Sequence, residues 1–306
     1  MTGPTKDSLL ALALVVAMAP LLPGIAARTR AVLTGRRGAP AWQLYADLWK
    51  LARRGAVYST TTTWIFRMAP VAALAASIAA ALLVPLDGRA GIVRFGGDAV
   101  AFAYVLGLGR FMLALGALDT GSSFEAMGAS RDVTFASIVE FGLLLTFAAL
   151  AVATGDLSLS GMFGTSLAAK SGALAAPLML LALGLFALML AECARVPVDD
   201  PSTHLELTMV HEVMVLDHGG PDLAMILYAG ALKLALFSAL AVGLVVPRAA
   251  WTAPASLAGL AAGLAVSAAA VGVVEAVTAR LRMAKVPLYV FGSAALGGFA
   301  LILLLR

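Results

Sequence analysis

The sequence predicts an all-α integral membrane protein with about eight transmembrane helices, an amphipathic interfacial helix and a polar cytoplasmic loop-helix. The 306 residues are 61% hydrophobic and 12% charged, and their mean hydropathy is +0.97. This composition leaves too little polar surface to cover a water-soluble globule. Apolar runs of about 20 residues, the length that spans a bilayer, recur between charged or turn residues. We therefore expect one membrane domain, residues 1–306, embedded in the lipid bilayer.

Eight apolar runs are long enough to cross the bilayer once each. The first run follows Lys6 and resembles a signal peptide, but it is long and no soluble domain follows it, so we expect a retained first helix. Pro247, Arg248 and Pro254 supply the only break between the sixth and seventh runs. The expected crossings are roughly residues 8–26, 64–85, 99–118, 133–154, 173–192, 222–247, 252–276 and 286–305.

Basic residues are concentrated in alternate loops, and this pattern indicates the orientation of the chain. The loop after the first crossing carries a dense group of Arg and Lys, whereas the loops on the opposite side hold isolated charges. Since Lys and Arg are retained on the cytoplasmic side, we expect both termini on the outer side of the cell membrane. The unusual polar segments then all emerge on the cytoplasmic side, at residues 27–63, 119–132, 193–221 and 277–287.

The first cytoplasmic loop contains an amphipathic sequence. Trp42, Tyr45 and Trp49 can share one side of a helix, while Lys50 and Arg53 lie among the charged residues on the rest of its surface. This pattern favours a helix that lies in the membrane interface as an anchor. The alternative is a helix that docks a partner protein.

The segment from Ala191 to Gly220 is the most polar part of the chain. Glu192 and Arg195 are three residues apart and could pair at the end of the fifth crossing. Asp200 and neighbouring hydroxyl residues favour helix capping after the two prolines, at positions 197 and 201, that prevent a continuous helix. The segment holds six carboxylates: Glu192, Asp199, Asp200, Glu206, Glu212 and Asp217.

Glu206 and Glu212 are interleaved with Leu, Met and Val residues in a predicted helix that touches the bundle. Carboxylates in apolar surroundings have raised pKa values and can exchange protons near neutral pH. A salt-bridge role with partner or loop arginines explains the same pattern, and the residues alone leave both roles open.

Three histidines, His204, His211 and His218, recur every seven residues and would lie near one stripe of a helix. This spacing suggests a metal site, but no HExxH motif is present and His218 adjoins a Gly-Gly break. We therefore favour helix-surface or proton-relay roles and expect no metal in this chain.

Four charged residues fall within predicted crossings, where a charge is unfavourable unless it is paired or hydrated. Glu140 and Glu275 could line a wet path from the inner face together with Glu192. Interhelical ion pairs, for example of Lys233 with Glu140 or Glu275, are the alternative. The four residues are Arg110, Glu140, Lys233 and Glu275.

Several function classes are excluded. The single cysteine, Cys193, rules out a disulfide framework, a multi-cysteine zinc site and an iron–sulfur cluster in this chain. The glycine-rich stretches match neither a Walker loop nor a dinucleotide fingerprint, and no serine lies in a nucleophile elbow. We expect no catalytic residue, no cofactor and no nucleic acid on this chain.

Three motifs resemble a known family: DTGSSFEAMGASRD at 119–132, ECARVPVDDPSTHLELTMVHEVMVLDHGGPDLA at 192–224 and EAVTARLRMAKVP at 275–287. Together they are similar to the subunit-1 (H-type) membrane family of respiratory complex I. They resemble more closely its counterpart in energy-converting group 4 nickel–iron (NiFe) hydrogenases and formate hydrogenlyase. That branch commonly has two glycines where this chain has Glu125 and Ala126, so the charge of Glu125 has no explanation from the resemblance.

The resemblance implies a membrane anchor and coupling subunit, non-catalytic alone, that links electron transfer in a docked hydrophilic arm to proton or sodium translocation. The residues implied in ion coupling, together with the intramembrane Lys233, are Glu140, Glu192, Arg195, Asp199, Glu206, Glu212, Glu275 and Lys233. Those expected to dock partners are Arg131, Asp200, His204, His211, Asp217, Arg280 and Arg282.

The resemblance also implies partners and cofactors outside this chain. It implies a hydrogenase large subunit-like protein and small iron–sulfur subunits at the cytoplasmic face, with antiporter-like membrane subunits beside the bundle. The NiFe centre and the iron–sulfur clusters would lie on those partners.

Two other functions remain open. One is the same fold in a quinone-reducing NADH dehydrogenase-like complex. The other is an autonomous ion-coupled secondary transporter with Glu140, Lys233 and Glu275 as its ion site. The sequence shows neither the inverted repeat nor the paired broken helices that such transporters have.

Overall fold

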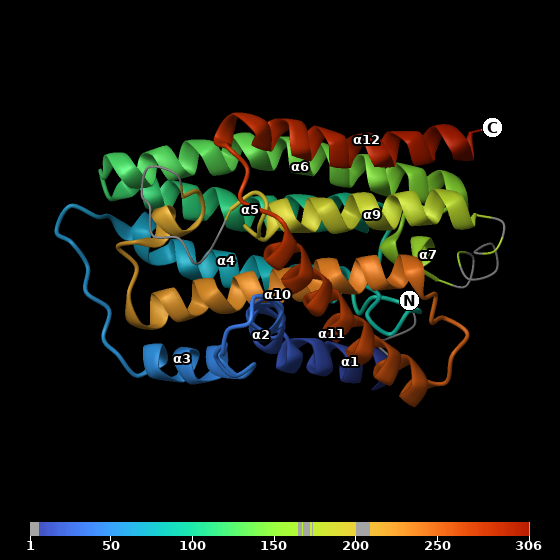
Figure 1. The fold of residues 1–306 in the computed structure, drawn as a ribbon, viewed down its shortest axis with the longest axis horizontal. Helices are drawn as coiled ribbons and strands as arrows, with labels where there is room; N and C mark the ends of the chain where they lie inside the picture. The colour runs from blue at the N-terminus through green and yellow to red at the C-terminus, as the bar shows by residue number, and fades with distance from the viewer. Residues whose placement is uncertain (1–5, 165–166, 168–171, 173, 200–208, 306) are drawn as a thin grey trace.

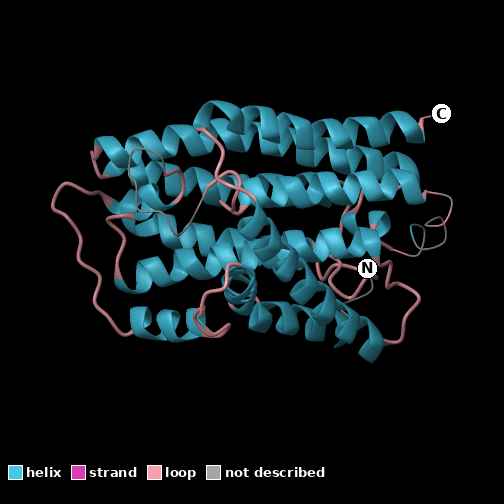
Figure 2. Ribbon diagram, viewed as in Figure 1, coloured by secondary structure: helices cyan, strands magenta, loops and turns pink. Residues whose placement is uncertain are grey.

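The computed structural model describes residues 6–164, 167, 172, 174–199 and 209–305. Every regular element in these residues is helical, as Figure 2 shows, and no strand occurs among them. Seven helices are long and apolar enough to cross a membrane, and a bent pair of shorter helices raises the total to eight. The predicted fold class, an all-α membrane protein of about eight crossings, is confirmed.

The long helices run roughly side by side along the longest dimension of the molecule, except α11 (Ala253–Val277), which lies obliquely to it (Figure 1). They are α4 (Trp64–Leu83), α5 (Asp98–Asp119), α6 (Ser123–Thr154), α9 (Ala175–Glu192), α10 (Gly220–Val245), α11 (Ala253–Val277) and α12 (Val286–Leu304). Helix α10 is the most enclosed, with 67% of its most apolar window buried inside the bundle. It contacts α4, α9, α11 and α3, so it joins spans from both halves of the chain.

The first crossing is broken, which corrects the expectation of one helix over residues 8–26. Helices α1 (Lys6–Met18) and α2 (Leu21–Leu33) meet at an angle of 48°. Pro20 lacks a backbone N–H, so the carbonyl of Val16 has no helical partner four residues ahead. The hydroxyl of Tyr228 donates to that carbonyl at 2.9 Å, and the hydroxyl of Tyr45 donates to the carbonyl of Ala17. Side chains from α10 and α3 therefore complete the backbone hydrogen bonding at the break.

Helix α6 is longer than its crossing and begins ten residues before the expected position 133. Residues 123–132, which were expected in a loop, are therefore helical. A positive φ of 73° at Gly121 turns the chain after α5, and Glu125 places a negative charge in the first turn of α6. This extension carries the end of the 119–132 motif beneath the polar loop that follows α9.

Helix α3 (Gln43–Ala52) has the amphipathic character expected of the first cytoplasmic loop. None of its residues is fully buried, and the adjacent Trp42 and the helical Trp49 are 65% and 61% exposed. Leu44 packs against the bundle, and the guanidinium of Arg53 lies 4.2 Å from the ring of Trp49. The helix thus rests on the bundle and presents its aromatic residues outward.

The start of α1 and the end of α12 lie at the same end of the bundle (Figure 1). The short helix α7 (Leu159–Met162) lies at that end, where Oδ1 of Asp98 accepts a hydrogen bond from the backbone of Leu159. The opposite end carries the turn between α5 and α6 and the 3-10 helix η1 (Glu212–Val215), whereas η2 (Met283–Lys285) leads into α12.

Candidate functional site

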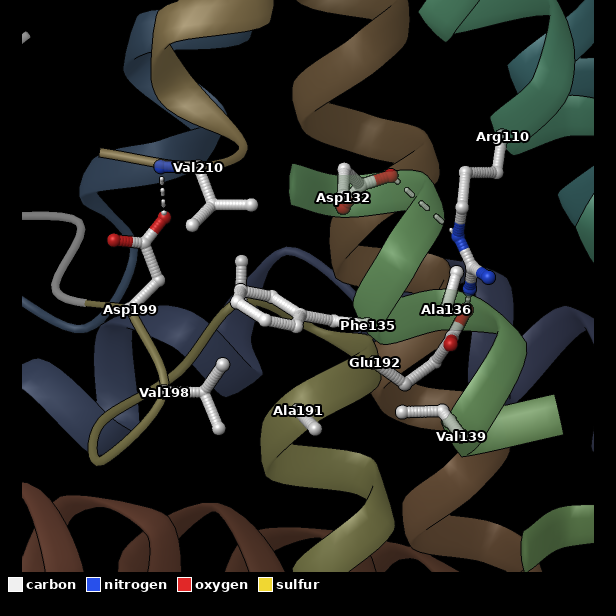
Figure 3. A pocket seen from close by; sticks show the side chains of 11 residues that line it. Arg110, Asp132, Phe135, Ala136, Val139, Ala191, Glu192, Val198, Asp199 and Val210 are labelled. Atoms are coloured by element: carbon white, nitrogen blue, oxygen red, sulfur yellow. Dashed lines mark hydrogen bonds and ion pairs between the residues drawn. The ribbon is translucent and has the colours of Figure 1, made fainter. Parts of the chain in front are cut away.

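A buried arginine lies at the centre of the site. Arg110, on the otherwise apolar helix α5, points its guanidinium between carboxylates from two other helices (Figure 3). Its Nε lies 3.7 Å from Oδ2 of Asp132 on α6, and its Nη2 pairs with Oε1 of Glu192 at the end of α9. The Glu192 side chain is only 5% exposed. A buried ion is tolerated only when opposite charges surround it, so these helices must pack together for Arg110 to be stable.

A second cation shares the same carboxylate. The Nζ of Lys233, on α10, lies 3.4 Å from Oε1 of Glu192. Arg110, Asp132, Glu192 and Lys233 thus form a group of two positive and two negative side chains from four helices, which we call the central cluster. Lys233 pairs with Glu192, and neither of the two partners suggested from the sequence, Glu140 and Glu275, forms an ion pair with it.

Glu140 lies two turns beyond Asp132 on α6. A small cavity of about 10 Å³ joins it to Arg110 and Glu192. Within the described part of the chain it forms no ion pair, because the guanidinium of Arg110 is already engaged. Glu140 is therefore a neighbour of the central cluster, placed where a proton could reach it through one water molecule.

Two further ion pairs join the segment that follows α9 to α11 and to the segment that follows α11. Nη1 of Arg195 lies 3.4 Å from Oε1 of Glu275 on α11, so Arg195 does not pair with Glu192 as its spacing suggested. Nη2 of Arg280 lies 2.9 Å from Oδ1 of Asp199. Arg280, which was expected to dock a partner, is thus engaged within the chain.

The described part of the polar loop, residues 209–219, is held by backbone contacts. Oδ2 of Asp199 accepts hydrogen bonds from the backbone of Val210 and His211, both at 3.1 Å. Nη1 of Arg131 donates to the carbonyl of Met209 at 3.2 Å. Arg131 therefore positions the loop, and its guanidinium is used inside the chain.

The prediction that the histidines lie near one stripe of a helix is wrong for His211 and His218, the two that the structure describes. Glu212–Val215 forms a short 3-10 helix that ends before His218, so His211 and His218 do not share one α-helical face. Burial lowers the pKa of His211, although the nearby charges of Asp132 and Asp199 oppose that shift. Asp200, His204 and Glu206 lie outside the described residues.

Besides the cavities of about 10 and 20 Å³ at Arg110, two larger ones adjoin the central cluster. The larger, about 180 Å³, has Glu192, Lys233 and Glu212 on its polar side and Pro23 and Leu44 on its apolar side. The smaller, about 40 Å³, lies on the other side and reaches Arg110, Asp132, His211 and Lys233. Spaces of this size that adjoin charged groups can hold ordered water. Both cavities thus have a residue of the polar loop, His211, and a member of the central cluster, Lys233, in their walls.

Cys193 also lines the larger cavity. Burial raises the pKa of its thiol to about 12, so the sulfur stays protonated and is a poor metal ligand. In the residues described here, no group of three His, Cys, Asp or Glu side chains is arranged to hold a metal ion.

Glu125 and His218 form a second buried polar region that the sequence did not reveal. Oε1 of Glu125, a residue only 1% exposed, accepts a hydrogen bond from the backbone of Asp217 at 3.1 Å. The ring of His218 stacks on Phe66 with centroids 3.9 Å apart. The carboxyl group of Glu125, which the family resemblance did not explain, thus lies inside the molecule, and its hydrogen bond joins α6 to the polar loop.

The central cluster contains two residues that were not among the predicted site residues. Arg110 was identifiable as a charge inside an apolar run. Asp132 gave no such signal, because it lay in a segment expected to be a loop, and only the extension of α6 brings it opposite Arg110. Of the remaining predicted docking residues, Asp217 and Arg282 are exposed at the surface.

Comparisons with known proteins show which family the chain resembles. The family model described as NADH dehydrogenase matches residues 6–305. Hydrogenase-4 component C from Escherichia coli K12 is 33% identical over 230 residues, which are 75% of this chain and 71% of that protein. Formate hydrogenlyase subunit 4 from the same organism is 35% identical over 149 residues, 49% of this chain and 48% of the relative.

A solved structure shares the fold. It is that of the membrane-bound sulfane sulfur reductase, an archaeal respiratory membrane complex, with a TM-score of 0.81 and 19% sequence identity. The match covers 97% of this chain and 98% of the other. The two E. coli relatives are named as a component and a subunit of larger enzymes. The predicted resemblance to the complex I subunit 1 family is confirmed, and the chain belongs to the NADH dehydrogenase family.

Proposed function

We propose that the chain is the membrane anchor and coupling subunit of an ion-translocating redox complex of the group 4 NiFe hydrogenase or formate hydrogenlyase type. The observation that carries the proposal is the central cluster, a balanced set of buried charges with cavities leading from the polar loop. The two E. coli relatives, named as parts of hydrogenase-4 and formate hydrogenlyase, support this type of complex.

The coupling step follows from the shared carboxylate. Glu192 neutralises both Arg110 and Lys233, so a proton that arrives on Glu192 leaves two cations with Asp132 as their remaining counter-ion. Since Arg keeps its proton, the compensating loss occurs at Lys233. A charge change at the loop, near Asp199 and Glu212, would bias this exchange through the larger cavity.

The partners and cofactors belong to the same proposal. A hydrophilic arm with a large NiFe subunit and iron–sulfur subunits would dock on the polar loops, where Asp217 before α10 and Arg282 before α12 are exposed. The NiFe centre and the iron–sulfur clusters lie on those subunits, and antiporter-like subunits lie beside the bundle. The bundle sits in the cell membrane with both termini on its outer side.

The proposal is tested with Glu192→Gln and Glu212→Gln variants in the assembled complex. Ion translocation per transferred electron is measured in vesicles, and electron transfer is measured separately with a soluble acceptor. We expect the number of ions translocated per electron to fall at least several-fold in Glu192→Gln, while electron transfer to the soluble acceptor continues. Asp156→Asn, at an exposed outer turn, is the matched control. Normal ratios in both glutamate variants would contradict the proposal.

A quinone-reducing complex of the same family is the second candidate. The apolar side of the larger cavity, between Pro23 and Leu44, favours it because such a wall can receive a quinone-like ring. Purification with identification of the subunits distinguishes the two. A large subunit that carries two Cys-x-x-Cys nickel-ligand pairs supports the hydrogenase type, and a chain that purifies alone supports a transporter.

A further inference from the structure

Arg248 is a buried cation far from the central cluster, in the short connection between α10 and α11. The residue is only 2% exposed. Its Nη2 donates to the carbonyl of Leu86 at 3.5 Å, the long limit of a hydrogen bond. Its Nε and Nη1 are buried and have no hydrogen-bond partner within the described chain. Most of the hydrogen-bonding capacity of this guanidinium is therefore unused.

Arg248 has no acidic side chain in direct contact among the residues that the structure describes. Within the described residues it forms no ion pair at 4.0 Å or less. The charge of Asp87 acts on it from further away. The Asp87 carboxylate is occupied by the hydroxyl of Ser8 at 2.9 Å and by the backbone N–H groups of Arg89 and Ala90. Asp87 thus acts on Arg248 only at a distance, and its oxygens make no direct contact with the guanidinium.

A small cavity lies beside Arg248. It measures about 10 Å³ and is lined by Pro85, Gly88, Phe163 and Gly243 beside Arg248. Gly88 has a φ of +78°, and a Cβ atom there would lie 3.2 Å from the Cβ of Arg248. A Cβ at Gly243 would lie 2.9 Å from the ring of Phe163. The two glycines thus keep open a space that is large enough for one particle of about the size of water.

The charge decides what occupies this space. A guanidinium stays protonated, and a buried cation without a counter-ion is strongly unfavourable. A water molecule would accept hydrogen bonds from the guanidinium but would leave its charge uncompensated. A monovalent anion accepts the hydrogen bonds and also compensates the charge. A phosphate or lipid headgroup is too large for the cavity. We propose that Arg248 and this cavity form a binding site for a small inorganic anion, with chloride as the physiological occupant.

The location indicates the purpose of such a site. The loop between α4 and α5 meets α1 and α11 here, through Ser8 on Asp87 and through the hydroxyl of Ser256, which donates to the carbonyl of Asp87 at 2.7 Å. Nη2 of Arg89 also donates to the carbonyl of Trp251 at 2.9 Å. A bound anion would neutralise the one buried charge in this junction that the described residues leave unpaired. The inference does not depend on the proposed function.

The first test is the thermal unfolding of the purified chain or its complex in detergent, in sodium chloride and in sodium gluconate at equal ionic strength. We expect chloride to raise the unfolding midpoint by about 2–4 °C in the wild type, because the anion binds the folded state. Arg248→Gln should lose this difference. Arg89→Gln, which removes a 44% exposed cation from the same junction, should retain it. An equal chloride effect in Arg248→Gln, or none in the wild type, overturns the site.

A second test needs no variant and covers the case in which Arg248→Gln does not fold. Crystals of the wild-type protein are grown with bromide in place of chloride, and the anomalous signal of bromide is mapped. A peak beside Nε or Nη1 of Arg248 supports the site. Density there without anomalous signal means that water fills the cavity, and overturns it.

Discussion

The Nζ atom of Lys233 lies 3.4 Å from Oε1 of Glu192, the oxygen that also pairs with Arg110. One carboxylate thus serves two cations, in a region where only 5% of the glutamate side chain reaches the surface. Because positive and negative charges balance within the central cluster, removal of any one member leaves a buried charge without compensation.

The first prediction concerns that balance. Lys233→Met removes one cation, and we expect it to lower the free energy of unfolding by about 3 kcal/mol, the usual cost of breaking a buried pair. Equilibrium unfolding in mixed detergent micelles measures this change. Lys285→Met, at the exposed start of α12, is the control and should change the free energy by less than about 0.5 kcal/mol. A Lys233→Met protein as stable as the control would show that the pair is not formed.

A second prediction concerns the break in the first crossing. Tyr228→Phe removes the hydroxyl that donates to the Val16 carbonyl, so a backbone acceptor in the bundle loses its partner. We expect a loss of about 1–2 kcal/mol in the free energy of unfolding. Tyr104→Phe, on a residue that is 58% exposed on the surface of α5, should be nearly neutral. Equal effects of the two substitutions would contradict the role of Tyr228.

The third prediction concerns pH. Burial lowers the pKa of His218 below its ordinary value near 6.5, against the opposing charges of Asp222 and Asp217. As the pH falls, His218 therefore takes up a proton in the unfolded chain at a pH where it is still neutral in the folded chain. Stability should fall as the pH drops below about 6.5, by at most about 1.4 kcal/mol per pH unit from this residue.

His218→Gln removes this titration while it keeps a polar side chain of similar size. The unfolding free energy of the variant, measured between pH 5 and pH 8, should vary less steeply with pH than that of the wild type. The comparison is made on the difference between the two curves, because the buried His211 contributes in both proteins. Parallel curves would mean that His218 is not buried in the neutral form.

The fourth prediction concerns the contact between α6 and the polar loop. A Cβ atom at Gly128 would lie 2.9 Å from the carbonyl oxygen of Val210 and closer still to the side chain of Val213. Gly128→Ala should therefore displace the loop and reduce the ratio of ions translocated to electrons transferred, with a loss of stability of about 1–3 kcal/mol. Gly292→Ala, on the exposed face of α12 with nothing within 4 Å, is the matched control and should leave both quantities unchanged. An unchanged ratio of ions to electrons in Gly128→Ala would show that the position of the polar loop does not affect coupling.

Much of the fold could be predicted because lipid imposes a simple rule. A crossing requires about 20 apolar residues, and the starts and ends of α5 and α9 lie within about two residues of the predicted limits. The same rule could not reveal the break at Pro20, because proline is tolerated in a crossing when other side chains satisfy the released carbonyl. Tyr45 and Tyr228, which do so here, are distant in the sequence.

Of the central cluster, Asp132 and the pairing of the charges could not be predicted from the sequence, whereas the other members could. Glu192 and Lys233 stand out in an apolar chain because charges there are costly. Which cation meets which carboxylate depends on the rotation of each helix, and Arg195 accordingly turns to Glu275 although Glu192 is three residues away. The burial of Glu125 could not be predicted either. An acidic residue next to a turn is expected at the surface, and only the packing of the folded chain shows that it is enclosed.

The broken first crossing has a consequence for the biosynthesis of the protein. Its carbonyl at position 16 is satisfied by a tyrosine 212 residues further along the chain. A ribosome delivers α1 and α2 to the membrane long before α10 exists, so this carbonyl must be satisfied meanwhile by water, by headgroups or by the insertion machinery. The α1–α2 segment, although it is synthesised before the other helices, therefore reaches its final structure only after the sixth crossing, α10, has been inserted.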